Sequence, residues 1–361
     1  MQLPSVVVND VEVVSDDLPN DSSLMVHIVV HRETPWIGIF LLFAAAVSSS
    51  STGAVMEYQG DVSVFLKLFW RRTLTTFSFT LLASTCLYRK GIPTCTRHIV
   101  AQVIVSGIAS AAYSSFFLLS MRYTSVGEAY LFCNSHTVLL VLRRIIFRLP
   151  VTFWEIAGAL LAVVGGVLCS LDKLSTNSEI KTSSHTMGNL IACTGAVGAA
   201  VFLTASKAVR KDLDLFVFMA SSSFVTATSL LIFILSFEEY SFSTDASIGL
   251  FGWIVPRMDR LGVELYFACI CDTFGTMGFV AVLKYFEPIV VSVVMLLQPF
   301  IATLEGLVLP MSTPLPGVLT ICGGLIVLSG TIAVLLQTKR MEFQVVTKNN
   351  QEYRFKYGSI E

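Results

Sequence analysis

The chain has 361 residues, of which 54% are hydrophobic and only 14% are charged, and its formal net charge is −1. A soluble domain carries about 25% charged residues, and a soluble protein this apolar would expose large hydrophobic patches. The composition therefore excludes an ordinary cytosolic enzyme, a nucleic-acid binder with a basic surface and a disordered chain, and it predicts a polytopic membrane protein.

Ten apolar runs are long enough to cross a bilayer, because a hydrocarbon core about 30 Å thick needs about 20 apolar residues per helix. They lie at residues 36–56, 68–88, 98–121, 126–146, 153–171, 187–206, 216–237, 263–283, 287–308 and 316–336. The longest connector between them is 238–262. The predicted fold class is an all-α membrane protein with ten transmembrane helices.

The second and fourth runs are the least suited to lipid. Trp70, Arg71 and Arg72 stand at the start of the second run, where we expect them to lie in the interface and snorkel. The polar residues of the fourth run are Glu128, Asn134, His136, Arg143 and Arg144. We expect protein or a wet cavity to shelter this run, since ionisable groups at membrane depth are costly.

Two polar tails, 1–34 and 337–361, flank the apolar runs. The first contains no apolar core of a signal peptide, and we expect it to be disordered. With ten spans both tails lie on one side of the membrane. That side holds sixteen of the 24 Lys and Arg residues, so the positive-inside rule predicts that both termini are cytoplasmic.

The two halves of the chain carry similar motifs at similar places. One basic residue followed by Tyr closes the third run (Arg122-Tyr123) and the eighth (Lys284-Tyr285). Glycines seven residues apart occur in the fifth and tenth runs, at Gly158 and Gly165 and at Gly317 and Gly324. The matching runs are five apart, and because five is odd the second half enters the membrane in the reverse orientation.

The pattern therefore predicts two inverted five-helix repeats, at 35–171 and 187–336, joined by a linker at 172–186. Such repeats are typical of secondary transporters, because two halves of opposite topology can expose one central site to either side in turn.

Several of these motifs resemble those of the EamA family of the drug/metabolite transporter superfamily. They are Phe117–Val126, Trp154–Gly158, Val164–Leu168, Val282–Tyr285, Gln298-Pro299, Glu305 and Gly317–Gly330. The resemblance covers the chain between its tails and implies a ten-helix transporter. The first repeat departs from the family at Asn134-Ser135-His136, and the ninth run has no Lys or Arg, which argues against a phosphorylated substrate.

Candidate site residues are the polar groups at membrane depth, because such groups tend to be functional. Asp272, near the middle of the eighth run, is either a proton or substrate-amine site or an acid hydrogen-bonded within the bundle. His136, with Asn134 close by, either relays protons or makes an interhelical hydrogen bond. Ser49 and Ser50 belong to the hydroxyl run 48–52, which either lines a polar path or lets helices pack closely.

The ninth run supplies two further candidates. Gln298-Pro299 is expected to loosen the helix and place Gln298 in a pocket, whereas Glu305 lies nearer the end of the run and belongs either to the pocket or to the interface. In the fifth run, Gly158, Ala162 and Gly166 form a small-residue face that we expect to pack against another helix.

We expect a secondary transporter that moves a small organic solute or metabolite by alternating access, with proton coupling left open. The alternative is a multi-pass membrane enzyme or a lipid-handling protein without transport activity. No catalytic motif is present, so no catalytic residue, metal site or cofactor is predicted. The expected partners are a small-molecule solute and membrane lipid, not nucleic acid, and homo-oligomerisation is left open.

Overall fold

A computed structural model describes most of the chain. The described residues are 13–14, 25–32, 36–60, 62–91, 93, 96–124, 126–148, 153–174, 182–210, 212–308, 318–337, 340–347 and 354–356. Gly317 of the second glycine pair and residues 175–181 of the predicted linker lie outside them. The predicted linker is helical at both ends, because α7 continues to Leu174 and α8 begins at Thr182.

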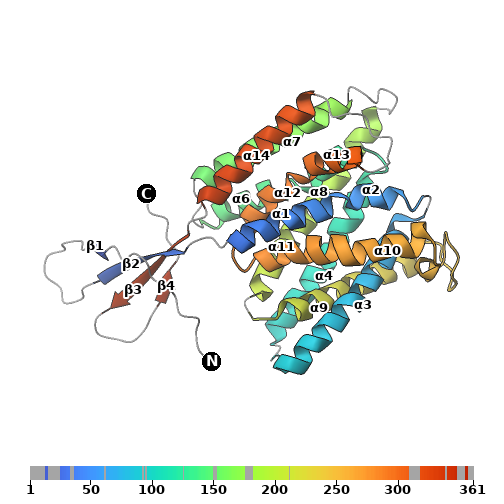
Figure 1. The fold of residues 1–361 in the computed structure, drawn as a ribbon, viewed down its shortest axis with the longest axis horizontal. Helices are drawn as coiled ribbons and strands as arrows, with labels where there is room; N and C mark the ends of the chain where they lie inside the picture. The colour runs from blue at the N-terminus through green and yellow to red at the C-terminus, as the bar shows by residue number, and fades with distance from the viewer. Residues whose placement is uncertain are drawn as a thin grey trace.

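Apolar helices form the body of the molecule (Figure 1). The first half contains α1 (Trp36–Ser50), α2 (Thr52–Glu57), α3 (Val64–Lys90), α4 (Arg97–Ser120), α5 (Val126–Cys133), α6 (His136–Ile146) and α7 (Phe153–Leu174). The second half contains α8 (Thr182–Val209), α9 (Leu215–Phe237), α12 (Pro288–Met295), α13 (Gln298–Val308) and α14 (Val318–Gln337).

Between α9 and α12 runs one long helix in four parts. The parts are η2 (Met258–Gly262), α10 (Val263–Tyr266), η3 (Phe267–Thr276) and α11 (Met277–Val282). η2 and η3 are π-helical, a geometry that is rare and is frequently found at functional sites. The connector that precedes this helix contains the short 3-10 helix η1 (Gly252–Ile254).

Five helices are long and apolar enough to cross a membrane. They are Trp36–Met56, Arg97–Ser120, Thr186–Val209, Leu215–Phe237 and Met258–Val282. Three shorter apolar helices accompany them, at Ile156–Leu168, Pro288–Ala302 and Ile321–Leu335. The protein is therefore a helical membrane protein by the length and composition of its helices.

Local chemistry explains where several helices begin and end. Thr96 caps α4 by accepting a hydrogen bond from the backbone N–H of Ile99, and Asp214 caps α9 in the same way for Phe216. Gly91 ends α3 with a φ of 80°, which only glycine adopts without strain.

Two of the apolar runs are helices broken near their middle. The fourth run is interrupted at Asn134 and Ser135, between α5 and α6, and the ninth is interrupted at Leu296 and Leu297, between α12 and α13. Pro299 does not itself break the ninth run. It is the second residue of α13, where its missing N–H has no intrahelical partner to lose.

Helices from the two halves pack side by side. α7 lies along α14, α4 along α8, α3 along α9, and α1 along η3 and α11. Glycine allows the first pair to approach closely, since a Cβ at Gly158 would lie 2.7 Å from the carbonyl oxygen of Gly330, and one at Gly165 would lie 2.5 Å from that of Gly323. Of the small-residue face predicted in the fifth run, Gly158 and Ala162 pack against Gly330 of α14, whereas Gly166 packs against Leu131 of α5.

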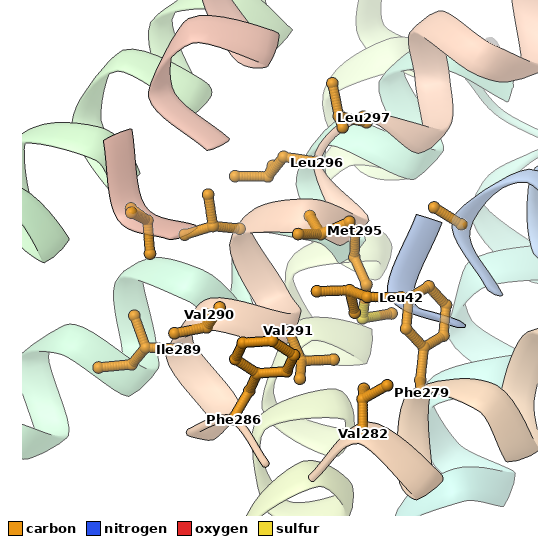
Figure 2. Close-up of a cluster of buried hydrophobic side chains, with 14 of the residues drawn as sticks. Leu42, Phe279, Val282, Phe286, Ile289, Val290, Val291, Met295, Leu296 and Leu297 are labelled. Carbon is orange, nitrogen blue, oxygen red and sulfur yellow. The ribbon is translucent and has the colours of Figure 1, made fainter. Parts of the chain in front are cut away.

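The largest hydrophobic core lies where α1, α11 and α12 meet (Figure 2). Leu42 comes from α1, Phe279 from α11, and Val291 and Met295 from α12. All four side chains are buried, so α12, the first part of the broken ninth run, packs through apolar contacts in this core.

The tails form a four-stranded antiparallel sheet in the order β1-β2-β3-β4, beside the helical body in Figure 1. Its strands are β1 (Val13–Val14), β2 (Met25–Arg32), β3 (Arg340–Thr347) and β4 (Arg354–Lys356). β2 pairs with β3 from Met25 opposite Thr347 to Arg32 opposite Arg340. Residues 13–14 and 25–32 of the N-terminal tail are therefore in strands, and the rest of 1–34, which was expected to be disordered, lies outside the described residues.

Candidate functional site

A cavity lies between the two halves, among helices from both of them. Its volume is about 80 Å³. Its walls are Ser49, Thr52, Leu68, Arg71, Arg72, Ser110, Tyr113, Ser114, Phe117, Leu118, Tyr130, Ala199, Phe202, Leu203, Thr276, Phe279, Met295 and Gln298. Polar side chains and aromatic or aliphatic ones thus share the lining, as in many sites for small organic molecules.

Asp272 binds a buried arginine of α3 through both of its oxygens. Arg71 donates from Nε to Oδ2 at 3.0 Å and from Nη2 to Oδ1 at 2.7 Å, and Arg71 and Asp272 are both buried. Thr75 donates to Oδ2 at 2.6 Å and Thr276 to Oδ1 at 3.1 Å. A carboxylate held by a bidentate arginine and two hydroxyls has little capacity left for a substrate amine.

Arg72 lies beside this pair but is bound much more loosely. Its Nη1 is 3.4 Å from Oδ1 of Asp272 and its Nη2 is 3.4 Å from Oγ of Ser114. Its Nε has no hydrogen-bond partner among the described residues, although the side chain is buried. The wall of the cavity therefore contains one well-paired arginine and one poorly paired arginine.

The two broken helices meet through a chain of amides. Nδ2 of Asn134 donates to the backbone oxygen of Met295 at 2.8 Å and to Oε1 of Gln298 at 3.0 Å. Nε2 of Gln298 donates in turn to Oγ of Ser49 at 2.6 Å. These bonds bring together three of the residues singled out in the sequence and connect the breaks of the fourth and ninth runs to α1.

The hydroxyl run 48–52 is divided between two roles. Ser49 lines the cavity, whereas the hydroxyl of Ser50 donates back to the carbonyl of Ala46 at 2.6 Å, within its own helix. Tyr130 donates to the carbonyl of Ser50 at 3.0 Å and so binds the end of α1. Of the two predicted serines, the structure brings only Ser49 to the cavity.

His136 and Glu305 do not line the cavity. His136 is buried, with Nδ1 3.0 Å from the carbonyl oxygen of Cys133, and its Nε2 has no partner among the described residues. Glu305 is partly buried on α13, and its Oε2 likewise has no hydrogen-bond partner there. The sequence left open whether Glu305 belongs to a pocket and whether His136 relays protons, and the structure places both side chains outside the lining of the cavity.

The two arginines of the site were not predicted from the sequence. Arg71 and Arg72 were expected to snorkel at a membrane interface, but both are buried and line the cavity. α3 begins at Val64, before the predicted start at residue 68, and this places the arginines about two turns inside the helix. The sequence feature that could have indicated these arginines is the presence of two cations in the second run and one acid, Asp272, in the eighth.

Polar contacts also link helices at both ends of the bundle, outside the lining of the cavity. At one end Lys207 donates to the carbonyl oxygens of Leu283 (2.5 Å) and Phe286 (3.0 Å), and Glu287 lies 3.8 Å from Lys207 and 3.9 Å from Arg144.

At the other end Gln59 donates to Glu264 at 2.7 Å, and Arg260 donates to the carbonyl oxygens of Gln59 (3.2 Å) and Ala246 (2.8 Å). Within the described residues, no group of three or more His, Cys, Asp or Glu side chains is placed to hold a metal ion.

Comparison with known proteins shows a similar fold and no matching family. No family model matches the chain, and no curated protein matches it. A solved structure described only as "Crystal structure of protein" is similar, with a TM-score of 0.61 and 18% sequence identity over 84% of this chain and 99% of that chain. At that identity the two proteins share a fold, and nothing follows about a shared activity.

Proposed function

We propose that the protein is a secondary transporter that moves a small organic solute across a membrane by alternating access. In this proposal the chain has ten transmembrane helices in two inverted repeats, as in the EamA family, with both termini in the cytoplasm. The observation that carries the proposal is the cavity between the two halves, which is lined by residues of both.

The pattern of helix contacts supports an inverted repeat. If each span of the first half corresponds to the span five places later, α3 corresponds to α9 and α7 to α14, and both of these pairs are in contact. By the same rule α1 corresponds to α8, and α4 corresponds to the helix that contains η3 and α11. The contact of α1 with η3 and α11 then corresponds to the contact of α8 with α4, and both contacts exist. A twofold axis between the halves requires this kind of exchange.

The two broken helices support the proposal in the same way. They occupy corresponding places in the two halves, and α5 contacts α13 just as α12 contacts α6. Discontinuous helices near the middle of the membrane are typical of the substrate sites of transporters, because the breaks free backbone groups and side chains to bind a solute. Here the breaks lie beside the cavity, at Asn134 and next to Gln298.

The pairing of the two tails favours an even number of membrane crossings. β2 precedes the first apolar helix and β3 follows the last one, and they are hydrogen-bonded along their whole length. Both therefore lie on the same side of the helical body.

Flux measurements on a variant with a filled cavity test the proposal. Ser110 is buried and lines the cavity, so Ser110→Trp should abolish uptake into proteoliposomes across a panel of labelled organic solutes. Ile108→Trp is the matched control, because Ile108 lies on the same helix and is 52% exposed on the outside of the bundle. Saturable uptake that survives Ser110→Trp, or no uptake of any solute by the unmodified protein, would contradict the proposal.

A further inference from the structure

We infer that the solute is a small monocarboxylate with an apolar body, and that Arg72 is the residue that binds its carboxylate. This inference rests on the transport proposal above, and it names the class of solute that the same cavity would carry.

The charges around the cavity are unbalanced in favour of an anion. Arg71 and Arg72 are both buried, and Asp272 is the one carboxylate within ion-pair distance of either among the described residues. Glu264 interacts electrostatically with Arg71 but not with Arg72, and its Oε1 accepts a hydrogen bond from Gln59. Since a buried charge is costly when it is unpaired, the second arginine favours a ligand that brings one negative charge.

The geometry identifies Arg72 as the more loosely bound cation of the two. Arg71 is bonded to both oxygens of Asp272, whereas the contacts of Arg72 are 3.4 Å long and its Nε has no partner in the described part of the chain. A guanidinium offers a planar fork of donors that matches a carboxylate. Arg72 therefore has unused donors although its side chain is buried.

Hydroxyl groups beside Arg72 can complete the recognition of a carboxylate. Ser110, Tyr113 and Ser114 lie on α4 and line the same cavity. No hydrogen bond from the hydroxyl of Ser110 or Tyr113 to another described residue is present, and that of Ser114 has only its long contact with Arg72. An anion bound by Arg72 would lie among donors that have no other partner.

The remaining walls select the body of the solute. Phe117, Phe202, Leu203 and Phe279 contribute aromatic and aliphatic surface, so an inorganic ion would leave this surface without contact. The volume of about 80 Å³ suits a small molecule. One surplus positive charge matches a monocarboxylate better than the double charge of a phosphate monoester or the positive charge of an amine.

Equilibrium binding to the full-length protein in lipid nanodiscs tests this inference. The labelled probes are butyrate and benzoate, and the competitors are benzamide, benzylamine and phenyl phosphate. We expect saturable binding of at least one labelled carboxylate that the unlabelled carboxylates displace and the amide and amine do not.

Variants identify the residue responsible. Arg72→Gln should weaken carboxylate binding by at least about tenfold, because it removes a charged hydrogen-bond donor. Arg72→Lys should be intermediate, since it keeps the charge but loses the fork. Arg143→Gln is the control and should bind normally, because Arg143 is exposed and contacts Thr204 away from the cavity. Thermal unfolding of each variant establishes that it is folded.

The outcomes separate the two proposals. Binding of the amide, the amine or the phosphate monoester in preference to both carboxylates would overturn the inference, as would unchanged carboxylate binding in a folded Arg72→Gln or no binding of either carboxylate. Carboxylate binding that depends on Arg72, without transport of any solute, would uphold the inference and contradict the transport proposal. Transport of amines or neutral solutes alone would uphold the transport proposal and overturn the inference.

Discussion

The pairing of Arg71 with Asp272 makes this carboxylate a structural anchor of the cavity. Asp272→Asn would leave two buried arginines without a counter-charge, and breaking a buried pair costs about 3–5 kcal/mol. We expect a large fall in the thermal unfolding temperature in detergent. In the double variant Arg71→Met/Asp272→Asn one of these cations is gone, so part of the stability should return.

The opposite result would restore an interpretation left open by the sequence. If Asp272→Asn unfolds at the unmodified temperature and only transport changes, Asp272 would be a free acid that takes up a proton or an amine. The five hydrogen bonds and contacts at its two oxygens make that result unexpected.

Asp214, at the start of α9, gives a pH-dependent contribution outside the membrane. Partial burial alone would raise its pKa, but hydrogen bonds from Lys90 at 2.7 Å and from the backbone N–H of Phe216 outweigh that effect and lower the pKa. A depressed pKa stabilises the fold above the unfolded value of about 4, and the contribution disappears as the pH falls through the lowered pKa.

Asparagine separates the charge of Asp214 from its capping role. Asp214→Asn keeps a good helix cap, so it should lower the unfolding temperature slightly at pH 7 and not at all at low pH. Asp214→Ala also removes the cap and should cost about 1 kcal/mol more at every pH. Equal effects of Asp214→Asn at both pH values would show that the ion pair contributes nothing.

At the scale of helices, the amide chain between the two breaks should behave as one unit. Gln298→Leu removes the partner of Ser49 and one partner of Asn134, and unpaired buried groups cost about 1–3 kcal/mol each. Combining it with Asn134→Leu should give a non-additive loss of unfolding free energy. Ser329 is exposed on α14, so the loss caused by Ser329→Ala should simply add to that caused by Gln298→Leu. If the losses caused by Gln298→Leu and Asn134→Leu are additive as well, the network is not coupled.

The contact between α7 and α14 depends on the absence of side chains. Gly158→Ala would place a Cβ 2.7 Å from the carbonyl oxygen of Gly330, and overpacking typically costs about 1–3 kcal/mol. Leu160→Ala, on the same helix but 59% exposed, should have little effect. Thermal unfolding of the two variants compares them directly, and equal stabilities would show that the helices can separate without cost.

The sequence predicted these elements unevenly. Apolar runs and their charged or proline boundaries were visible, and so were Asn134 and Gln298 as polar groups at membrane depth. The position of the ninth-run break was not, because Pro299 is tolerated in the first turn of α13 and the chain turns at Leu296 and Leu297 instead. Periodicity does not reveal such a break in a segment that is apolar on every side.

For the whole molecule, composition was enough to predict a helical membrane protein, and five helices meet the length and hydropathy needed to cross a membrane. The sequence did not predict which polar residues would share a cavity, because this depends on which faces of α3, α4 and η3 meet. Arg72 and Asp272 are 200 residues apart, and only the packed helices bring them within 3.4 Å of each other.

The central claim is that one cavity opens in turn to the two sides of the membrane, and thiol labelling tests it without any knowledge of the solute. Ser110→Cys would be placed in a chain whose eight native cysteines have been replaced, and membrane-impermeant reagents would be added to right-side-out and to inside-out vesicles. We predict that Cys at this position reacts from both sides, whereas reaction from one side alone under every condition would contradict alternating access and favour a one-sided enzyme or lipid site.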